Sequence, residues 1–600
     1  MSAIPIPLSE PGAAFLGVER SLKGLRWRER GASPQAVAAL ARLHHLPDLA
    51  ARLLAGRGVD PEDAARFLDP RLRDWFPDPS RFKDMDAAAE AIEDAIAGKR
   101  PTAILADYDV DGATSAAQMI RYFRARGHDA SLYVPDRMAE GYGPSALAFE
   151  RLKAQGIQLV ITVDCGAAAE GPLRAAAGLG LDVVVLDHHL MSGPPPPALA
   201  VVNPNRPDCT SGEGDLTAAG VVLVTLAAVN RVARKRGSIG ANNLPDPMAT
   251  LDLAALGTVC DVAPLTRFNR AIVAQGLKIL KNKPNPGLAA LGLAAGRAGG
   301  AQVYDLGFVL GPRLNAGGRI GNATLATRLL LEEDPALIAE YAGQLDALNA
   351  ERRLIEAEIV QEAVAMAELF ADAPVLVLGA KAWHPGVIGI VAGRVKERVR
   401  KPVIVLGAAG EEGPAKGSGR SIGGVNLGAV VAAAAREGIL IAGGGHAMAA
   451  GMTVAWDEVD RFRDFLAARL GGEVAAASDE ARALSIDGLA GAGAVNLALI
   501  DAVERIGPFG TGHPEPIFAL AAMRARFAKK AGDAHVRFTL EDSRGAGVKG
   551  IAFGVADQPI GEALLKRDTV LHVAVKLKRN AFNGHESAEV ELVDAALASA

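Results

Sequence analysis

Three carboxylates alternate in the stretch Asp107-Tyr108-Asp109-Val110-Asp111-Gly112. The mostly apolar run before it, residues 102–106, is typical of a short buried β-strand. The acids therefore fall where a strand ends, which is where open α/β sheets bind their ligands. Because like charges this close together repel, we expect a cation to neutralise them, and oxygen ligands suit Mg²⁺ or Mn²⁺.

Further ligand candidates follow later apolar segments. Asp164 comes directly after residues 160–163, the triplet Asp187-His188-His189 comes after residues 183–186, and Asp261 ends the segment 257–260. We expect these side chains to face one crevice together with the first acidic stretch. Carboxylates with an imidazole suit a two-metal centre that clamps a phosphoryl group for in-line attack.

Each of these segments has a simpler interpretation when taken alone. A single aspartate after a strand is usually a helix N-cap or a turn former, and this alternative applies to Asp164 and to Asp187, which would then also orient a histidine. An isolated His-His pair is more often structural. The coincidence of four such segments, each at the expected edge of the sheet, favours the metal site.

Composition sets limits on the class of protein. A chain of 600 residues is too long for one core, so three or four domains are expected. The net charge of −5 means that local basic patches or metal would have to hold a nucleic acid. The three cysteines are widely separated, and the N-terminus shows no signal-peptide pattern. The longest apolar run, residues 216–230, is too short to span a bilayer. We therefore expect a cytoplasmic protein without membrane segments.

Alternating strand and helix patterns predict an α/β fold with a doubly wound, mostly parallel sheet. The predicted strands of this sheet are 102–106, 131–134, 159–163, 183–186 and 200–202. A long helix then leads to a second α/β unit, and five short strands near the C-terminus predict a small β-barrel. The predicted divisions are a helical extension at 1–95, the metal-binding domain at 96–330, the linker helix at 331–370, the second α/β domain at 371–483 and the barrel at 484–600.

The four segments resemble, in order, motifs I to IV of the DHH phosphoesterase superfamily, in which they bind two divalent cations. The resemblance implies that the cation ligands are Asp109, Asp111, Asp164, His188 and Asp261, with Asp164 bridging two Mn²⁺ or Mg²⁺ ions. It implies that Asp107 is a ligand or supports one. It also implies that His189 faces the substrate phosphate, where it stabilises charge or acts as a general acid.

Residues 383–392, Ser418-Gly419-Arg420-Ser421 and the glycine-rich 443–451 resemble segments of the DHHA1 domain of RecJ exonucleases. Residues 311–319 between the lobes and 67–70 in the N-terminal extension also resemble RecJ exonucleases. Candidate substrate-binding residues are Arg137, Arg313, Arg319, Ser418, Arg420, Gly444, Gly445 and His446. For the first three the alternative is a structural or surface ion pair, and for the glycines it is tight packing.

The tail would be the family's oligonucleotide-binding (OB) barrel. Positive and aromatic residues gather there, as expected for backbone neutralisation and base stacking on a single strand: Arg524, Arg526, Phe527, Lys529, Lys530, His535, Arg537 and Phe538. For Phe527 and Phe538 the alternative is barrel core. The resemblance implies a 5′-to-3′ exonuclease specific for single-stranded DNA that acts in recombination and repair. Single-strand-binding protein, a helicase and mismatch-repair factors are the expected partners.

Three other functions are alternatives to the exonuclease. DHH–DHHA1 phosphodiesterases of cyclic dinucleotides or short oligoribonucleotides lack an N-terminal extension and a barrel. Non-catalytic scaffolds of this fold lose metal ligands, whereas every ligand position is filled here. Inorganic pyrophosphatases are shorter two-domain chains. The length and the barrel therefore favour the exonuclease.

Overall fold

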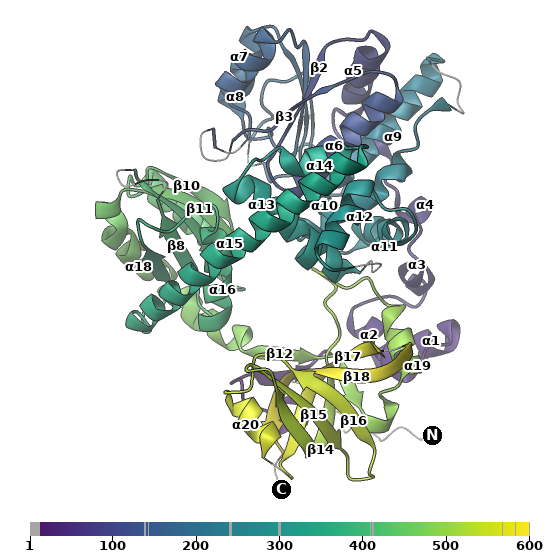
Figure 1. Cartoon of the computed structure of the whole chain (residues 1–600), viewed down its shortest axis with the longest axis vertical. Helices are drawn as coiled ribbons and strands as arrows, with labels where there is room; N and C mark the ends of the chain where they lie inside the picture. Colours follow the sequence, from purple (N-terminus) through teal and green to yellow (C-terminus); the bar gives the residue numbers. More distant parts are fainter. Residues whose placement is uncertain are drawn as a thin grey trace. The chain divides into compact units, whose positions relative to one another are not determined.

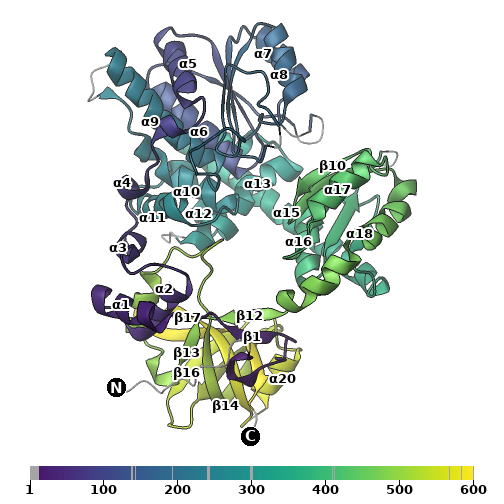
Figure 2. The ribbon, with the colours of Figure 1, turned by 180° about the vertical axis from the view of Figure 1, so that it is seen from behind.

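The computed structural model describes residues 13–136, 140–141, 143–191, 193–238, 243–297, 302–408, 410, 413–566, 568–582 and 584–598. These fall into two compact units. One contains residues 70–477 together with the short turn 510–512, and the other contains residues up to 69 with 478–509 and 513–600 (Figures 1 and 2). Each unit has its own sheets and its own core.

The first sheet of the larger unit has five parallel strands in the order β3-β2-β4-β5-β6. They are β2 (Thr102–Ala106), β3 (Ser131–Tyr133), β4 (Leu159–Val163), β5 (Asp182–Leu186) and β6 (Ala200–Val202). This confirms the predicted fold class and, within a residue, the predicted strands. The central strands are buried on both faces, which is why the sequence shows continuous apolar runs there.

Helices cover both faces of this sheet (Figure 1). Alternate residues of β2 enter different cores: Ile104 packs with one set of helices, and Leu105 packs with the other. The first set is α5 (Met85–Ala97), α6 (Val110–Ala125) and α9 (Ala218–Arg236). The second is α7 (Ala146–Ala154) and α8 (Glu170–Gly178).

A helical layer extends the core that contains α6 and α9. It consists of α10 (Leu251–Cys260), α11 (Arg267–Asn282), α12 (Pro286–Ala294), a π-helical segment (Asp305–Leu310), α13 (Gly311–Ile320) and α14 (Leu325–Leu331). The long helix predicted between the lobes is α15 (Pro335–Leu369). It begins sharply because Asp334 accepts a hydrogen bond from the N–H of Ala336 and Pro335 occupies the first turn.

The second sheet has the order β10-β11-β9-β8-β7, with only β7 and β8 parallel. Its strands are β7 (Leu376–Gly379), β8 (Val403–Gly407), β9 (Ala415–Arg420), β10 (Ala442–His446) and β11 (Ala449–Val454). Its helices are α16 (Ile388–Val399), α17 (Leu427–Arg436) and α18 (Val459–Ala481). Trp383 is part of the apolar core between α15, α16 and this sheet.

The smaller unit contains the predicted barrel. Strands β14 (Phe518–Ala531), β15 (His535–Glu541), β16 (Gly547–Ala552), β18 (His585–Leu597) and β17 (Val570–Phe582) pair in this order, and β17 closes the ring on β14. A short strand, β13 (Gly488–Ala490), pairs in parallel with the first three residues of β14. Helices α19 (Leu497–Glu504) and α20 (Pro559–Leu565) complete it.

The N-terminal segment differs from the expectation of helices alone. Residues 26–29 form a strand, β1 (Arg26–Glu29), parallel to β12 (Ala483–Ile486). Trp27 is fully buried and its indole N–H donates to Asp594 of the barrel. The helices that follow, α1 (Pro34–His44), α2 (Asp48–Gly56) and α3 (Ala64–Leu68), share a core with α19. α4 (Leu72–Trp75) and α5 belong to the larger unit instead.

Candidate metal centre

The first acidic stretch spans the end of β2 and the start of α6. Asp109 is the N-cap of α6, and its carboxylate accepts hydrogen bonds from the N–H groups of Asp111 (2.9 Å) and Gly112 (3.1 Å). A side chain at position 112 is impossible, because a methyl carbon there would lie 2.4 Å from the carbonyl oxygen of Asp107. The glycine thus lets the helix start directly against the strand end.

Asp111 is anchored by a second helix. Its two carboxylate oxygens accept from the N–H groups of Ala218 (2.7 Å) and Ala219 (3.0 Å) at the start of α9, where the helix dipole favours negative charge. Gly257 of α10 packs against it, since a methyl carbon at that position would lie 2.6 Å from Oδ1 of Asp111. This close approach brings α10, and with it Asp261, to the end of the sheet.

Asp164 follows β4 in a left-handed backbone conformation, with φ of +61°. Its N–H donates to the carbonyl of Leu186, so the ends of β4 and β5 are joined at this point. Aspartate tolerates this conformation better than most residues, yet it remains strained. The buried carboxylate is thereby turned toward the acids that follow β2.

Asp187 acts as the organiser of the two histidines, which is the alternative role considered for it. Its Oδ1 accepts from the N–H of His188 (2.7 Å) and from Nδ1 of His189 (2.7 Å), and its Oδ2 accepts from the N–H of Ala167 (2.8 Å). The Nε2 atom of His188 consequently faces the carboxylates of the centre. The ring of His189 is held instead through Nδ1, which is bonded to Asp187.

Two asparagines that the sequence interpretation missed support this loop. Asn203 donates to the carbonyl of His189 (2.8 Å), and Asn205 donates to the carbonyl of His188 (2.6 Å). Both follow β6 in Asn203-Pro204-Asn205. The signal was available, since β6 ends at the same edge of the sheet and carries polar residues there.

Asp261 comes from a helix rather than from a strand end. It is the residue after the last turn of α10, with its N–H bonded to the carbonyl of Gly257. Its carboxylate lies 3.8 Å from Nε2 of His188. Helix α10 is apolar on all sides, so the sequence pattern did not show its helical period.

The seven predicted residues of the centre converge into overlapping groups. Ligand atoms within 4.8 Å of one another come from Asp107, Asp109 and Asp164, from Asp111, His188 and Asp261, and from Asp164, His188 and His189. Asp164 and His188 each belong to two of these groups, and the bridging of two cations by Asp164 stays a prediction. The buried Nε2 of His188 has no hydrogen-bond partner among the described residues although it lies 3.2 Å from Oδ1 of Asp164. A nitrogen lone pair and carboxylates around one point fit a divalent cation.

The pKa values of the residues in the centre also fit a bound divalent cation. Burial, with the charge of neighbouring carboxylates, raises the pKa of Asp111 to about 7, that of Asp261 to about 8, and that of Asp164 well above its usual value. Burial and the charge of His189 lower the pKa of His188 to about 4, so its ring is neutral, as a metal ligand must be. Three carboxylates that resist ionisation in one place need a positive charge to ionise together.

The pKa of His189 is shifted upward, opposite to that of His188. Burial alone would lower its pKa, but the hydrogen bond to Asp187 and the charge of that carboxylate raise the pKa of His189 to about 9. In the metal-free protein the ring is therefore an imidazolium at neutral pH. Burial would raise the pKa of Asp187, but the same hydrogen bond holds it at about 2. A positively charged hydrogen-bond donor held beside the carboxylates can stabilise an anionic phosphate.

Of the four arginines predicted to bind substrate, Arg137, Arg313 and Arg319 precede the second sheet in the sequence. Arg313 donates to Asp346 on α15 (2.8 Å) and to the carbonyl of Val309 (2.9 Å), which is the structural ion pair considered as its alternative. Arg319 donates to the carbonyl of Gly386 (3.0 Å). Arg137 lies outside the described residues. Phosphate contact by these side chains stays a prediction.

The second sheet brings the other predicted substrate-binding residues together. Gly444, Gly451 and Ser418 are register partners across β10, β11 and β9. Two positions further along these strands, His446 and Arg420 flank Ala449. Nη1 of Arg420 donates to Oγ of Ser418 (3.0 Å).

Gly389 at the start of α16 faces these two side chains. A methyl carbon at Gly389 would lie 3.0 Å from Oγ of Ser418 and 3.2 Å from Nη2 of Arg420. Gly444 faces open space. Gly445 has φ of +147° and packs tightly on the backbone of Ala449, so for it the packing alternative also holds.

The barrel residues divide between surface and core. Phe538 is core, whereas Phe527 is 55% exposed. Arg524 and Arg526 lie near Asp568, Arg526 also pairs with Glu541, and Lys530 pairs with Asp557. Lys529 and Arg537 are cross-strand neighbours and have no ion-pair partner within the described ranges.

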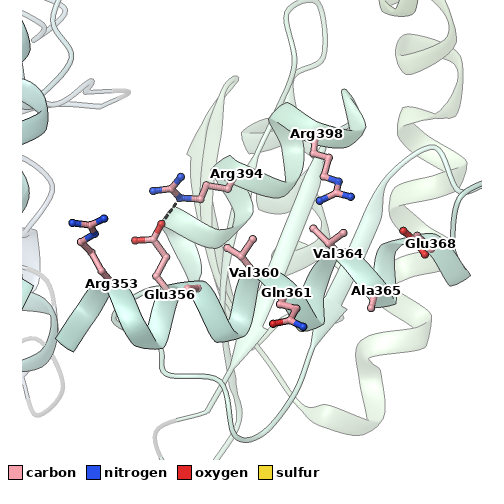
Figure 3. Close-up of a pocket in the computed structure, with 10 residues that line it drawn as sticks. Arg353, Glu356, Val360, Gln361, Val364, Ala365, Glu368, Arg394 and Arg398 are labelled. Carbon is pink, nitrogen blue, oxygen red and sulfur yellow. Dashed lines mark hydrogen bonds and ion pairs between the residues drawn. The ribbon is translucent and has the colours of Figure 1, made fainter. Parts of the chain in front are cut away.

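A cavity of about 630 Å³ between α15 and α16 is separate from the predicted site (Figure 3). Its floor contains Val360 and Val364, and Arg394 reaches from α16 to the carboxylate of Glu356, as Figure 3 shows. Glu356 is buried and also accepts from Arg352 (2.7 Å). None of the metal-ligand candidates lines this cavity.

Comparisons with known proteins agree with the geometry. Family models match at residues 101–258 (DHH family, N-terminal domain), 372–472 (DHHA1 domain) and 486–594 (RecJ OB domain). The single-stranded-DNA-specific exonuclease RecJ of Dickeya dadantii is 36% identical over 91% of this chain and 95% of its own length. That of Bacillus subtilis is also 36% identical, over 86% of this chain, which spans 64% of that relative's length.

Solved structures give the same result. RecJ of Thermus thermophilus in complex with Mn²⁺ superposes with a TM-score of 0.76 at 30% identity, covering 95% of this chain and 79% of that one. Its complex with Mg²⁺ gives a TM-score of 0.74 at 29% identity, with 96% and 79% coverage. The resemblance inferred from the motifs and the predicted succession of DHH, DHHA1 and OB folds are confirmed. The divisions at 95, 330, 370 and 483 stay predictions.

Proposed function

Because the chain belongs to the family of RecJ single-stranded-DNA-specific exonucleases, we propose that it hydrolyses single-stranded DNA from the 5′ end with two divalent cations, Mn²⁺ or Mg²⁺. The observation that carries the proposal is the convergence of five aspartates and two histidines at the end of one parallel sheet: Asp107, Asp109, Asp111, Asp164, Asp261, His188 and His189. Recombination and repair of DNA are the processes in which such an activity is used.

Two of the three groups of ligand atoms would hold the cations. Asp107, Asp109 and Asp164 form one group, and Asp111, His188 and Asp261 form the other. Bound divalent cations activate water and stabilise charge on a phosphoryl group undergoing in-line displacement. The backbone N–H groups that hold Asp109 and Asp111 keep these carboxylates in place without metal, so the centre is preorganised.

The imidazolium of His189 would face the scissile phosphate. Its proton on Nδ1 is held by Asp187, and the exposed part of the ring is left for the substrate. There it stabilises negative charge, or donates a proton to the leaving oxygen. Asp187 therefore sets both the orientation and the charge of this histidine.

Ser418, Arg420 and the β10 residues Gly444 to His446 would bind a terminal phosphate and so define the 5′-to-3′ direction. A guanidinium next to a hydroxyl matches two phosphate oxygens, and the glycine at 389 leaves room beside them. In the barrel, Lys529 and Arg537 place two like charges side by side, an arrangement that an anionic backbone would relieve.

In the described part of the chain, no helix combines the length and apolarity needed to cross a bilayer. A cytoplasmic location remains proposed, and so do single-strand-binding protein, a helicase and mismatch-repair factors as partners.

The test is a nuclease assay with Mn²⁺ on 5′-labelled and 3′-labelled single-stranded 30-mers, the matching duplex and a cyclic dinucleotide. We expect immediate release of 5′-labelled mononucleotide from the single strand alone, while the 3′ label stays on progressively shorter products. Cleavage of the cyclic dinucleotide alone would overturn the proposal and favour a small-molecule phosphodiesterase. Release of the 3′ label first would overturn the direction.

A further inference from the structure

A turn from far along the chain packs beside the metal-ligand candidate Asp261. Residues 510–512 form part of the larger unit, although residues 478–509 and 513–600 on either side belong to the smaller one. The N–H of Leu265, four residues after Asp261, donates to the carbonyl oxygen of Thr511 (2.8 Å). The turn lies about 250 residues after Asp261 in the sequence.

The turn fits there because of its two glycines. A methyl carbon at Gly510 would lie 2.7 Å from Cδ1 of Leu265, whose side chain is buried in the core. A methyl carbon at Gly512 would lie 3.1 Å from Cβ of Pro264, and Gly512 has φ of +72°. Close backbone approach and a positive φ are the two conditions that only glycine meets without strain.

The segment between Asp261 and Leu265 needs support from outside. Val262 has φ of +62°, an unfavourable conformation for a β-branched residue, and its side chain is 64% exposed. Its own side chain therefore does not hold it by packing. On one side the N–H groups of Val262 and Ala263 bond back to α10, and on the other side Leu265 is held by the turn.

Asp261 depends on this backbone more than the other ligand candidates do. Asp109 and Asp111 each accept two backbone hydrogen bonds through their carboxylates. Among the residues that the structure describes, the carboxylate of Asp261 accepts no hydrogen bond, and it lies 3.8 Å from Nε2 of His188. Its position consequently follows from the backbone conformation of the segment that the turn holds.

We propose that the Gly510–Gly512 turn is a positioning element for Asp261, and so sets the affinity of the cation that Asp111, His188 and Asp261 would share. This inference rests on the metal centre of the proposed function. The other group, Asp107, Asp109 and Asp164, contains no residue of the supported segment. The turn therefore acts on one cation and leaves the other unchanged.

Titration of the full-length protein with Mn²⁺ by calorimetry, without DNA, tests this. In Gly510→Val the added side chain displaces Leu265, and we expect one of the two Mn²⁺ affinities to fall about ten- to a hundredfold, as for loss of a supporting group around a ligand. The second affinity stays at the wild-type value. Thr511→Ala keeps the carbonyl acceptor and is the matched control, for which both affinities stay unchanged.

A second substitution that restores Mn²⁺ affinity would distinguish a positioning role of the turn from general damage to the fold. The double variant Gly510→Val/Leu265→Ala returns the space that valine takes, and we expect it to recover most of the lost affinity relative to Gly510→Val. If Gly510→Val does not fold, Gly512→Ala makes the same test with a smaller change. Two unchanged affinities, an equal fall of both, or no recovery in the double variant would each overturn the inference.

The measurement is independent of nuclease activity. A wild-type protein that binds two Mn²⁺ ions but does not cleave single-stranded DNA would refute the proposed function and leave the role of the turn to be judged on Mn²⁺ affinity. A nuclease with normal activity whose Gly510→Val variant binds both ions normally would refute the role of the turn alone.

Discussion

The Nε2 atom of His188 lies 3.2 Å from Oδ1 of Asp164, yet the two groups make no hydrogen bond. The same nitrogen is approached by Oδ2 of Asp111 at 3.7 Å. Leaving a buried ring nitrogen without a partner costs about 1–3 kcal/mol, so the arrangement has no advantage for folding alone. It is explained by a ligand that takes the lone pair and the carboxylate charge together.

We predict that Asp164→Asn lowers hydrolysis of single-stranded DNA by at least about a hundredfold, because loss of one preorganised charged group already costs that much. The metal-free variant should melt at the wild-type temperature or above it, since burial and repulsion from other carboxylates raise the pKa of Asp164. Labelled-strand assays and thermal melts without metal measure both effects. Near-normal hydrolysis would remove Asp164 from the centre.

Cation binding should depend on pH in a defined direction. The pKa of Asp111 is raised to about 7 and that of Asp261 to about 8, so both carboxyls hold protons at pH 6 in the metal-free protein. A cation must displace these protons, and Mg²⁺ affinity therefore rises from pH 6 to about pH 8 and then levels off. Calorimetry in buffers of different ionisation enthalpy would detect the released protons.

The same shifts predict how the metal-free fold responds to pH. A carboxyl with a raised folded-state pKa favours folding below its unfolded value near 3.8, and this contribution is lost as pH rises through 7 to 8. Melting temperature without metal should accordingly fall between pH 5 and pH 8, and saturating Mg²⁺ should reverse the fall. A melting temperature that stayed level over this range would contradict the shifts.

Asp187→Asn should act through His189. The pKa of His189 is raised to about 9 by the bond to Asp187, so an amide in its place lowers that pKa and leaves the ring neutral at pH 8. We expect activity to fall about ten- to a hundredfold at pH 8, and the basic limb of the pH–rate profile to move to lower pH. His189→Gln, which removes the titrating ring, should show no such limb.

Local sequence predicted the parallel sheet and the residues at its end. Strands such as β2 and β4 are uninterrupted apolar runs because both faces are buried, and their ends place Asp107 and Asp164 without further information. The second sheet and the barrel followed from the same alternation of patterns.

The remainder depends on partners distant in sequence. Strand β1 is Arg-Trp-Arg-Glu, and only its pairing with β12, about 450 residues later, makes it a strand. The ion pair of Arg313 requires Asp346 from α15, and the support of Leu265 requires Thr511. Neither neighbour can be identified from the local pattern.

The last prediction concerns binding of single-stranded DNA by the barrel, and the contacts of the barrel determine which variants can test it. Removing the residues after 484 would leave Trp27 and β1 without their partners, so point variants are the better probe. Lys529 and Arg537 lie side by side on β14 and β15, without ion-pair partners in the described ranges. Lys530, the next residue, pairs with Asp557 at 2.8 Å and serves as the control.

We expect Lys529→Ala and Arg537→Ala each to weaken binding of a long single strand and to reduce the slope of log affinity against log salt by about 1, because each neutralised phosphate releases a counterion. Cleavage of a very short strand should stay near the wild-type rate, since the barrel adds affinity rather than catalysis. Lys530→Ala should change the slope less, because its charge is already balanced. Equal slopes for all three variants would mean that the DNA does not follow this face of the barrel.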